Sequence, residues 1–398
     1  MSVSFDKKDG NVVVVIGTGP GGGVLASELA QKGVKVVALE AGGRHGPEDF
    51  VNDEWASFGQ ISWLDSRSTS GSWRVAKDFS GLPAWIVKGV GGSSQHWAGA
   101  SLRFQEHEWK TQTVYGNVTG ASLLDWPIDA KTMDPYYTKA EEKLRVTRTG
   151  GRKGLPGNNN YKVFEAGAKK LGYKDVHTGR MAINSKDYDD FVACQQTGFC
   201  FQGCKWGAKW SAGYNEIPVG EATGNLEVRI NSQALKIEHD ASGKVTGVIY
   251  ADADGKQHVQ KARIVCVAGN SIESPRLLLN SASSMFPDGL ANSSGQVGRN
   301  YMRHMTGSVY ATFDKPVKCG GAPLWQASSR TKLGTTHLAG LLAAMNWKHC
   351  RLVFHLWRRS SILALGDASS RQLLINMRTW RGCGLLVKTC RKKQTVFR

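Results

Sequence analysis

The chain has 398 residues, 41% of them hydrophobic and 21% charged, a composition that excludes a disordered or fibrous protein and leaves room for about two or three domains. Its net charge of +18 would on its own indicate a nucleic-acid or anionic-membrane partner. The charge is not evenly spread, however, because residues 318–398 carry +14 and the first 317 residues only +4.

The N-terminal residues predict one βαβ unit. Residues 11–16 form a short apolar run of β-branched side chains, typical of a strand buried on both faces of a parallel sheet. Residues 24–32 have apolar side chains at helical spacing, and residues 34–39 supply the next strand. The first run ends at Gly17, too soon for the core of a signal peptide, and no apolar run reaches the ~18 residues of a spanning helix. We therefore expect no signal peptide of its own and no membrane span.

The turn between the first strand and the helix has the glycine spacing of a dinucleotide-binding site. Gly17, Gly19 and Gly22 match the pattern G-x-G-x-x-G, and Glu40 ends the second strand. The first glycine permits a tight turn, the second lets the backbone approach a pyrophosphate, and the third lets helix and strand pack closely. An acid at the end of the second strand accepts hydrogen bonds from a ribose. The sequence therefore predicts a dinucleotide site, for which FAD and NAD are both candidates.

A second glycine-rich loop lies within residues 57–120, a Gly-, Ser- and Trp-rich stretch that predicts long loops over a ligand. Small and hydroxyl residues beside aromatics suit a backbone that packs against a pyrophosphate and a flat ring, although a flexible surface loop has a similar composition. Small residues also lead from Glu40 to Arg44, where the phosphate edge of FAD could approach. These two features favour FAD over NAD. The candidate residues of the second loop are Gly91, Gly92, Ser93, Ser94, His96 and Trp97.

Three cysteines in a glycine-containing loop form the next candidate site. Cys194, Cys200 and Cys204 are spaced so that three thiolates can converge on one centre, and thiolates are the usual ligands of iron–sulfur clusters. Free thiols or a disulfide fit the same spacing. Zinc is disfavoured because a fourth ligand at the usual short spacing is missing.

The remaining predicted elements are mostly strands. A helix is expected over residues 131–146, and strands over residues 226–230, 245–251 and 258–267, the last two joined by a turn at Asp254–Gly255. Residues 274–279 begin a helix with Pro275 in its first turn.

Five sequence stretches together resemble one known family, the glucose-methanol-choline (GMC) flavoprotein oxidoreductases. The resemblance runs in the family's order from about residue 11 to 317 and is strongest to the branch of sugar and sugar-acid dehydrogenases that includes gluconate 2-dehydrogenase flavoprotein subunits. His96-Trp97 replaces the Leu-Asn more usual in GMC oxidases, and the segment from Gly269 to Pro275 is one residue longer than in many members; both differences favour the dehydrogenase branch. The stretches are the N-terminal fingerprint with Glu40-Ala-Gly, residues 91–99, residues 126–128 with 134–141, residues 268–279 and residues 297–304.

The resemblance implies an α/β fold with a Rossmann-like FAD-binding domain built from residues 1–125 and 222–300. Gly269 would belong to the cofactor site, and residues 126–221 and 301–317 would form part of an α+β substrate region. His304 would lie near the flavin or pack as an ordinary buried histidine. In some FAD sugar dehydrogenases a similar cysteine loop holds a [3Fe–4S] cluster, which would place one at Cys194, Cys200 and Cys204.

The same resemblance implies oxidation of a CH–OH group of a sugar, polyol or sugar acid, with hydride transfer to the flavin. Electrons would pass to a cytochrome or quinone. A cytochrome c subunit and a small chaperone-like subunit are the expected partners. Because large subunits of this family often travel on a partner's export signal, the chain would be cytoplasmic, or periplasmic through its partner.

Residues 318–398 break the resemblance. In GMC enzymes the catalytic base is a His with a His or Asn partner near the C-terminus, and nothing in these residues resembles that segment. We hypothesise that they are an aberrant, frame-shifted tail, which resequencing across the Lys318 codon tests, and that the chain turns over little. The rival, a basic module for nucleic acid or lipid, lacks a fold motif and regular aromatic spacing, so we expect no nucleic-acid partner.

Two other functions remain open from the sequence. A nicotinamide-dependent dehydrogenase would share the first glycine turn but would leave the second glycine loop and residues 269–279 unexplained. A non-catalytic FAD-binding protein would hold a flavin that no substrate reduces.

Overall fold

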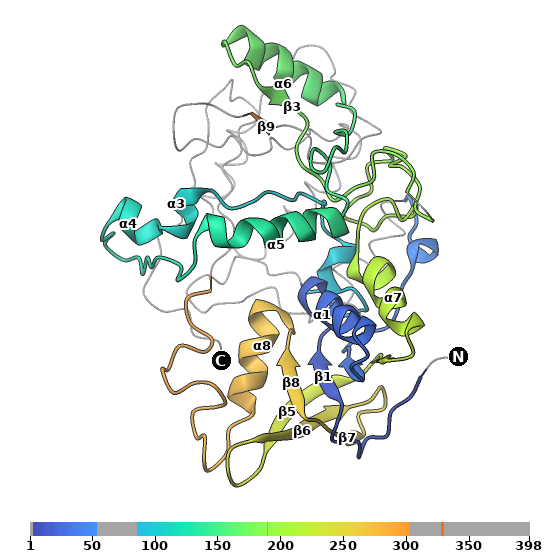
Figure 1. The fold of residues 1–398 in the computed structure, drawn as a ribbon, viewed down its shortest axis with the longest axis vertical. Coiled ribbons are helices and arrows are strands. Elements are labelled where there is room, and N and C mark those ends of the chain that lie inside the picture. The colour runs from blue at the N-terminus through green and yellow to red at the C-terminus, as the bar shows by residue number, and fades with distance from the viewer. Residues whose placement is uncertain (1–2, 54–85, 189, 302–327, 330–398) are drawn as a thin grey trace, which may run out of the picture. The chain divides into compact units, whose positions relative to one another are not determined.

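The computed structural model describes residues 3–53, 86–188, 190–301 and 328–329, drawn in colour in Figure 1. These residues fall into two compact units. The described part of unit 1 runs to Trp97 and resumes over Phe201–Tyr301, and that of unit 2 covers Ala98–Cys200 and the short strand at 328–329. Unit 1 is thus assembled from two separated stretches, the first ending at Trp97 and the second beginning at Phe201. The predicted aberrant tail and His304 lie outside the described residues.

Unit 1 is centred on a four-stranded parallel sheet in the order β4-β2-β1-β8. The register pairs Val13 of β1 with Val36 of β2 on one side and with Ile264 of β8 on the other. Every residue of β1 and β2 is buried, as expected for apolar strands covered on both faces. The predicted βαβ unit is therefore present. Its elements and the outer strands are β1 (Val13–Ile16), α1 (Pro20–Gln31), β2 (Val36–Leu39), β4 (Leu226–Arg229) and β8 (Ile264–Val267).

The side chains of the central strands point alternately to the two faces of the sheet, so each face has its own hydrophobic core. One set of β1 and β2 side chains packs against Ala26 and Ala30 of α1 and against Ile217, which begins α7 (Ile217–Ala222) after the π-helical turn η4 (Ala212–Glu216). The other set packs against Ile237, Val248 and further residues of an antiparallel sheet and α8. The parallel sheet is thereby enclosed between a helical layer and a second sheet, formed by β5 (Gln233–His239), β6 (Val245–Ala251) and β7 (Gln257–Lys261).

Three details differ from the predicted elements. The run predicted as one strand over residues 258–267 is split between β7 and β8, which belong to different sheets. Strand β5 was not predicted, because its sequence mixes charged and apolar residues without strict alternation. Helix α8 (Asn270–Asn280) begins four residues earlier than expected, so Pro275 lies inside it rather than in the first turn. Two short 3₁₀ helical turns, η1 (Pro47–Asp49) and η3 (Gly92–Gln95), complete unit 1.

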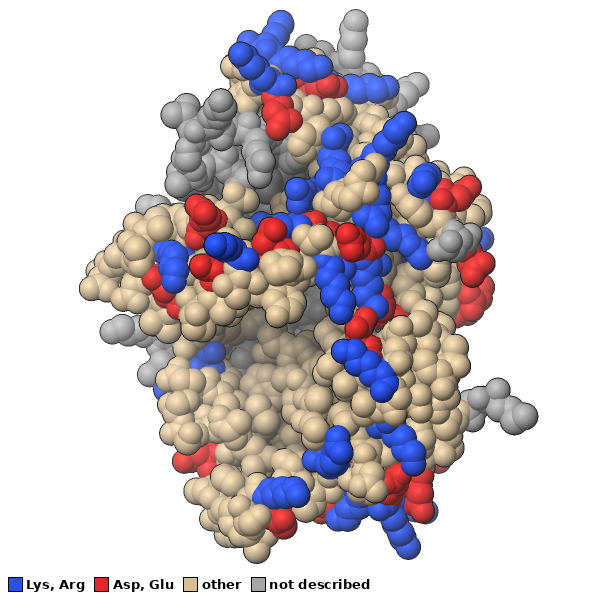
Figure 2. All heavy atoms as spheres, in the orientation of Figure 1, with Lys and Arg blue, Asp and Glu red and all other residues tan. Residues whose placement is uncertain are grey.

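The regular elements in the described part of unit 2 are mostly helices. Its longest helix, α5, confirms the helix predicted from residue 131, and Asp129 caps it by accepting a hydrogen bond from the N–H of Thr132 at 2.8 Å. Arg103 pairs with Glu141 and Asp134 of α5, and Figure 2 shows acidic and basic side chains interspersed in the band around this helix. The elements are α3 (Glu106–Trp109), α4 (Thr111–Tyr115), α5 (Ala130–Lys143), α6 (Asn159–Lys170), and the antiparallel pair β3 (Val176–His177) and β9 (Ser328–Ser329). Among the helices described in either unit, none is long and apolar enough to cross a membrane.

Candidate functional site

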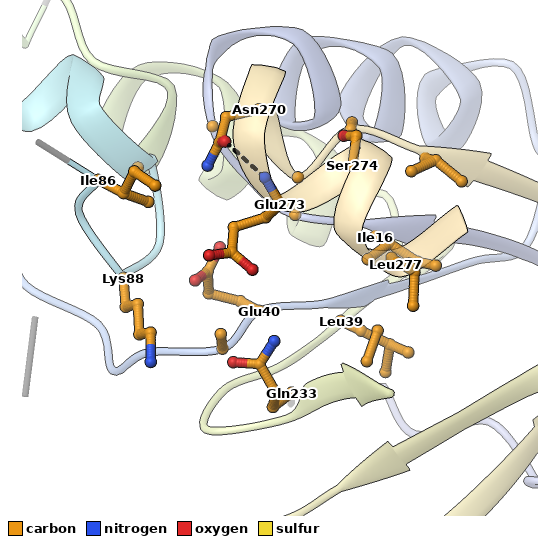
Figure 3. A pocket seen from close by; sticks show the side chains of 18 of the residues that line it. Ile16, Leu39, Glu40, Ile86, Lys88, Gln233, Asn270, Glu273, Ser274 and Leu277 are labelled. Carbon is orange, nitrogen blue, oxygen red and sulfur yellow. Dashed lines mark hydrogen bonds between the residues drawn. The ribbon is translucent and has the colours of Figure 1, made fainter. Parts of the chain in front are cut away.

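A cavity of about 540 Å³ opens in unit 1 at the carboxyl ends of the parallel strands. The last residues of β1, β2 and β8 line it, together with Gly17 after β1 and the two residues that follow each of β2 and β8. Open α/β sheets bind ligands at this edge, and the volume falls in the range of about 300–1,000 Å³ usual for small-molecule and cofactor sites. Figure 3 shows side chains from β2, α8, β5 and the loop at residue 88 around this cavity.

The first glycine turn has the geometry that its spacing predicts. Gly17 has φ +93°, and a Cβ there would lie 2.7 Å from the carbonyl oxygen of Ala268. A Cβ at Gly22 would overlap the carbonyl oxygen of Gly17, so α1 can approach β1 only through a glycine. Gly19 lines the cavity, and the position of its Cβ has no atom within 4 Å. The turn therefore leaves open space at the N-terminus of α1, where backbone N–H groups and the helix dipole favour an anion.

Glu40 lies at the end of β2, buried against the cavity. Its Oε2 accepts hydrogen bonds from the N–H of Thr18 at 3.0 Å and from Thr18 Oγ1 at 2.6 Å. Its Oε1 accepts from the N–H of Gly42 at 3.1 Å and of Gly89 at 3.0 Å. Burial raises the pKa of this carboxyl group, and the four hydrogen bonds offset part of the rise. One side chain thus ties together the first glycine turn, the end of β2 and the second glycine loop.

The second glycine loop packs directly against the first. Gly91 and Gly92 have φ values of +97° and +51°, which favour glycine. The N–H of Gly91 donates to the carbonyl oxygen of Thr18 at 3.2 Å, and a Cβ at Gly92 would lie 3.0 Å from the Cα of Gly19. Gly92 and Ser93 line the cavity. The structure therefore brings the two predicted glycine motifs together around one space.

The rest of the second loop supports this space from behind. Ser94 Oγ donates to the carbonyl oxygen of Gly91 at 2.5 Å and lies 3.1 Å from Ser211 Oγ. His96 Nδ1 is 2.7 Å from the carbonyl oxygen of Phe201, and Trp97 Nε1 donates to that of Trp210 at 2.9 Å. Ser94, His96 and Trp97 are absent from the lining of the cavity, and a direct role for them in the cofactor site stays a prediction.

The predicted residues Arg44 and Gly269 have different surroundings. Arg44 makes a two-pronged ion pair with Glu221 of α7, with nitrogen–oxygen distances of 3.1 and 2.5 Å, and does not line the cavity. A role of Arg44 in the cofactor site stays a prediction. Gly269 lines the cavity as the residue that precedes α8.

Sequence reasoning did not identify several polar residues of the cavity. Glu273 projects into it from the first turn of α8 (Figure 3) and pairs with Arg276 at 2.6 Å. Asn270, with φ +75°, accepts hydrogen bonds at its Oδ1 from the N–H groups of Ile272 and Glu273. The available signal was the position of Glu273, four residues after Gly269 at the start of a predicted helix. Lys88 and Gln233 also line the cavity.

Lys209 is a further residue that the sequence did not single out. Its side chain is buried, and Nζ donates to the carbonyl oxygens of Gln95 at 2.8 Å and Trp97 at 2.7 Å. It thereby holds the end of the turn η3 whose first residues line the cavity.

The three cysteines are divided between the two units. Cys194 and Cys200 pack against the apolar cluster of Leu155, Met181 and Ile183 in unit 2, whereas Cys204 belongs to unit 1 and accepts at Sγ from the N–H of Lys209 at 3.4 Å. None of the three forms a disulfide. Across the described ranges, no group of three or more His, Cys, Asp or Glu side chains is placed to hold a metal ion, so the structure gives no support to the predicted [3Fe–4S] site.

The donor set of the cavity does fit an adenine dinucleotide such as FAD. The open direction above Gly19 and the N–H groups at the start of α1 suit the pyrophosphate, and the acidic groups near the end of β2 suit the hydroxyls of a ribose. Gly92 and Ser93 line the same space from the second loop.

The sequence profile of the family described as GMC oxidoreductase matches residues 74–306. The fructose dehydrogenase large subunit of Gluconobacter japonicus is 28% identical over 348 residues, which cover 79% of this chain and 62% of that protein. The 2-methyl-1,2-propanediol dehydrogenase of Mycolicibacterium austroafricanum is 31% identical, with coverages of 77% and 56%. The gluconate 2-dehydrogenase flavoprotein of Pantoea cypripedii is 23% identical, with coverages of 76% and 57%. The chain thus spans less than two thirds of the length of these relatives.

Solved structures agree on the fold. A pyridoxine 4-oxidase from Mesorbium loti superposes with a TM-score of 0.53 at 17% identity, covering 83% of this chain and 65% of that one. A fungal aryl-alcohol oxidase gives a TM-score of 0.52 at 17% identity, with coverages of 77% and 54%. At this identity the likeness concerns the fold alone.

Proposed function

Because the chain belongs to the GMC oxidoreductase family, we propose that it supplies the FAD-binding part of an enzyme that oxidises a CH–OH group. The observation that carries the proposal is the meeting of the two glycine loops, with Gly92 against Gly19, around a cavity at the carboxyl edge of the parallel sheet. A nicotinamide site would need only the first of these loops.

The residues of unit 1 have separate tasks in this proposal. Gly19 and the first N–H groups of α1 bind and neutralise the pyrophosphate. Glu40 orients both glycine loops, and Gly92 with Ser93 excludes water from one wall of the cavity. FAD, when bound, accepts the hydride that leaves the substrate carbon.

The substrate class proposed is a sugar, polyol or sugar acid. The names of two relatives support it, since one is a fructose dehydrogenase large subunit and another a gluconate 2-dehydrogenase flavoprotein. By the same analogy we propose a cytochrome or quinone as electron acceptor, with a cytochrome c subunit and a small chaperone-like subunit as partners. No electron-transfer step is assigned to the three cysteines, because the described residues do not form a cluster site.

We also propose that the 398-residue chain binds FAD but turns substrate over slowly. The support is that residues 318–398 carry no match to the His-containing segment expected in this family. The frame-shift hypothesis for these residues accounts for the missing segment.

One purification tests the proposal. The purified chain should carry FAD in about equal molar amount, recognised by its absorbance spectrum and by release of FAD on denaturation. Adding fructose, gluconate or a polyol should bleach that spectrum slowly or not at all. A chain that binds NAD and no flavin would contradict the proposal, and rapid bleaching would contradict the low turnover alone. Iron measured in the same sample tests the cluster separately.

A further inference from the structure

Positive charge gathers in one part of unit 2 that the proposed cofactor site does not use. Residues 143–186 contain eleven Lys and Arg against two acids, a net charge of +9, although the first 317 residues together carry only +4. Figure 2 shows the basic side chains gathered over α6 and over the segment that leads to it from α5. This charge is distinct from that of residues 318–398, and it belongs to residues that the structure describes.

Several of these cations have no acidic partner. Lys169 pairs with Glu165 at 2.7 Å, and Arg180 pairs with Glu141 at 2.9 Å. Among the described residues, six other Lys and Arg side chains have no carboxylate oxygen within 4.0 Å of a side-chain nitrogen. Their charge is therefore not neutralised within the fold. These six residues, called here the basic surface, are Arg148, Arg152, Lys153, Lys162, Lys170 and Lys174.

Hydrogen bonds join the segments that carry the basic surface. Tyr161 Oη of α6 donates to the carbonyl oxygen of Val176 in β3 at 3.2 Å. The carbonyl oxygen of Thr178 accepts from Arg148 Nε at 2.6 Å, and Thr178 Oγ1 donates to the carbonyl oxygen of Leu155 at 2.9 Å. The loop before α6, the helix itself and the strand beyond it are thus held together beneath the six cations.

The outward face of α6 combines lysines with apolar side chains. Lys162 and Lys170 lie two turns apart on this face, and the small side chain of Ala166 is exposed between them. Val163 is 38% exposed and Leu171, at the end of the helix, is 78% exposed. The long stems of lysines let their ammonium groups reach anions beside an apolar layer that neighbouring apolar side chains enter.

These features fit a lipid surface with anionic head groups better than nucleic acid or an acidic protein. Proteins that bind single-stranded nucleic acid stack the bases on aromatic side chains, whereas Tyr161 and Phe164, the aromatic residues of α6, are both half-buried. An acidic protein would account for the lysines but not for the exposed Leu171. A membrane surface accounts for both.

We propose that the basic surface of unit 2 docks the protein on membranes that contain anionic phospholipids, with Leu171 entering the boundary between head groups and acyl chains. Peripheral binding of this kind needs no spanning helix. The inference goes beyond the proposed FAD site and does not depend on it.

Flotation of the full chain with lipid vesicles tests the proposal. The chain should bind vesicles of phosphatidylcholine with about 30% phosphatidylglycerol but not phosphatidylcholine alone, and added salt should weaken the binding. Each lysine near an anionic surface contributes about five-fold in affinity. The double variant Lys162→Gln with Lys170→Gln should therefore bind about 25-fold more weakly than the wild type, and Leu171→Gln about ten-fold more weakly.

Matched variants outside the basic surface are the controls. Lys32→Gln with Lys256→Gln removes the same charge from exposed positions of unit 1. Leu124→Gln removes a leucine of unit 2 that is 72% exposed. Both controls should bind like the wild type. Residues 318–398 are present in every variant, so their contribution cancels from each ratio of affinities.

Three results would overturn the inference. One is a lysine double variant that binds like the wild type, which would assign the lipid contact to other residues. The second is equal binding to vesicles with and without phosphatidylglycerol. The third is no vesicle binding at all, with an acidic protein or RNA bound instead. The FAD content of each preparation, measured in parallel, tests the proposed function separately.

Discussion

Glu40 shows how a single buried carboxylate organises the site. Its oxygens accept from Thr18, Gly42 and Gly89, which lie on three different segments of unit 1. Buried donors that lose their acceptor cost free energy, so this residue affects the stability of the fold before any ligand arrives.

Replacing Glu40 by Gln should therefore destabilise the protein. The amide group of Gln turns two of the four acceptor positions into donors that face N–H groups, and we expect a loss of about 1–3 kcal/mol in the free energy of unfolding. Urea unfolding measures this loss, with the exposed Glu142→Gln as control. Equal stability of the two variants would show that Glu40 does not clamp the loops.

The pH dependence of stability should carry the signature of the same group. Burial raises the pKa of Glu40 above its ordinary value of 4.5, so the native state keeps this proton to a higher pH than the unfolded chain does. The contribution of Glu40 to stability is then fully present below about pH 4.5 and declines as the pH rises through the folded-state pKa. The stability of the wild type relative to Glu40→Gln should fall over that range in a series of urea titrations. A relative stability that rises with pH would mean that the four hydrogen bonds outweigh burial.

Among individual residues, the sequence predicted those whose role follows from the spacing of residues along the backbone. Gly17 and Gly22 lie in the tight turn and the close helix–strand contact that the G-x-G-x-x-G pattern predicts, because that pattern specifies backbone geometry. The role of Gly19 at a pyrophosphate stays a prediction. Glu273 and Lys209 could not be predicted, since their roles depend on side chains that meet across distant segments.

The turn between β1 and α1 contains two glycines within four residues that are needed for opposite reasons. At Gly22 the backbone of Gly17 leaves no room for a side chain, while at Gly19 the same direction is empty and faces the cavity. One position therefore serves packing and the other serves the ligand.

A matched pair of alanine variants should separate these two requirements. Gly22→Ala should lower the free energy of unfolding by about 1–3 kcal/mol through overpacking, whereas Gly19→Ala should unfold like the wild type. Gly19→Ala should instead weaken FAD binding by about ten-fold or more, or about 1.4 kcal/mol, because its methyl group occupies the space of the pyrophosphate. Thermal unfolding and fluorescence titration with FAD measure the two effects. If neither variant bound FAD more weakly than the wild type, the cofactor would have to bind elsewhere.

The turn η3 depends on Lys209 in a comparable way. Replacing Lys209 by Met leaves the carbonyl oxygens of Gln95 and Trp97 without this donor, which should cost about 1–3 kcal/mol of stability. FAD affinity should fall too, because Gly92 and Ser93 at the start of η3 line the cavity. The exposed Lys205→Met is the control. Normal FAD affinity in a destabilised Lys209→Met would show that η3 does not contribute to the site.

Elements with one dominant signal were predictable, and elements defined by their partners were not. The buried strands β1 and β2 follow from uninterrupted β-branched residues. The split between β7 and β8 is decided by which sheet each half joins, which no local pattern records.

At the scale of the whole molecule, most of the net charge and the candidate site lie in different parts of the chain. Residues 318–398 carry +14 of the +18, whereas the described residues that line the cavity lie between Ile16 and Asn280. The fold class follows from the N-terminal βαβ pattern, whereas the change between units at residues 97 and 201 has no compositional mark.

Removing residues 318–398 should therefore leave FAD binding unchanged. The truncated chain and the full chain should show the same dissociation constant in parallel titrations, and saturating FAD at about 100 times that constant should stabilise each by ~2.7 kcal/mol. A large loss of affinity on truncation would show that the basic tail contributes to the cofactor site.

The strand order β4-β2-β1-β8 also determines how late in synthesis the parallel sheet can be completed. Val13 of β1 pairs with Ile264 of β8, 251 residues later in the chain, so a ribosome has made most of the described protein before the central strand has both neighbours. Until then one edge of β1 carries unpaired backbone groups, a template for wrong pairing. The nascent chain should therefore depend on chaperones until the segment that completes the sheet and the cavity has emerged.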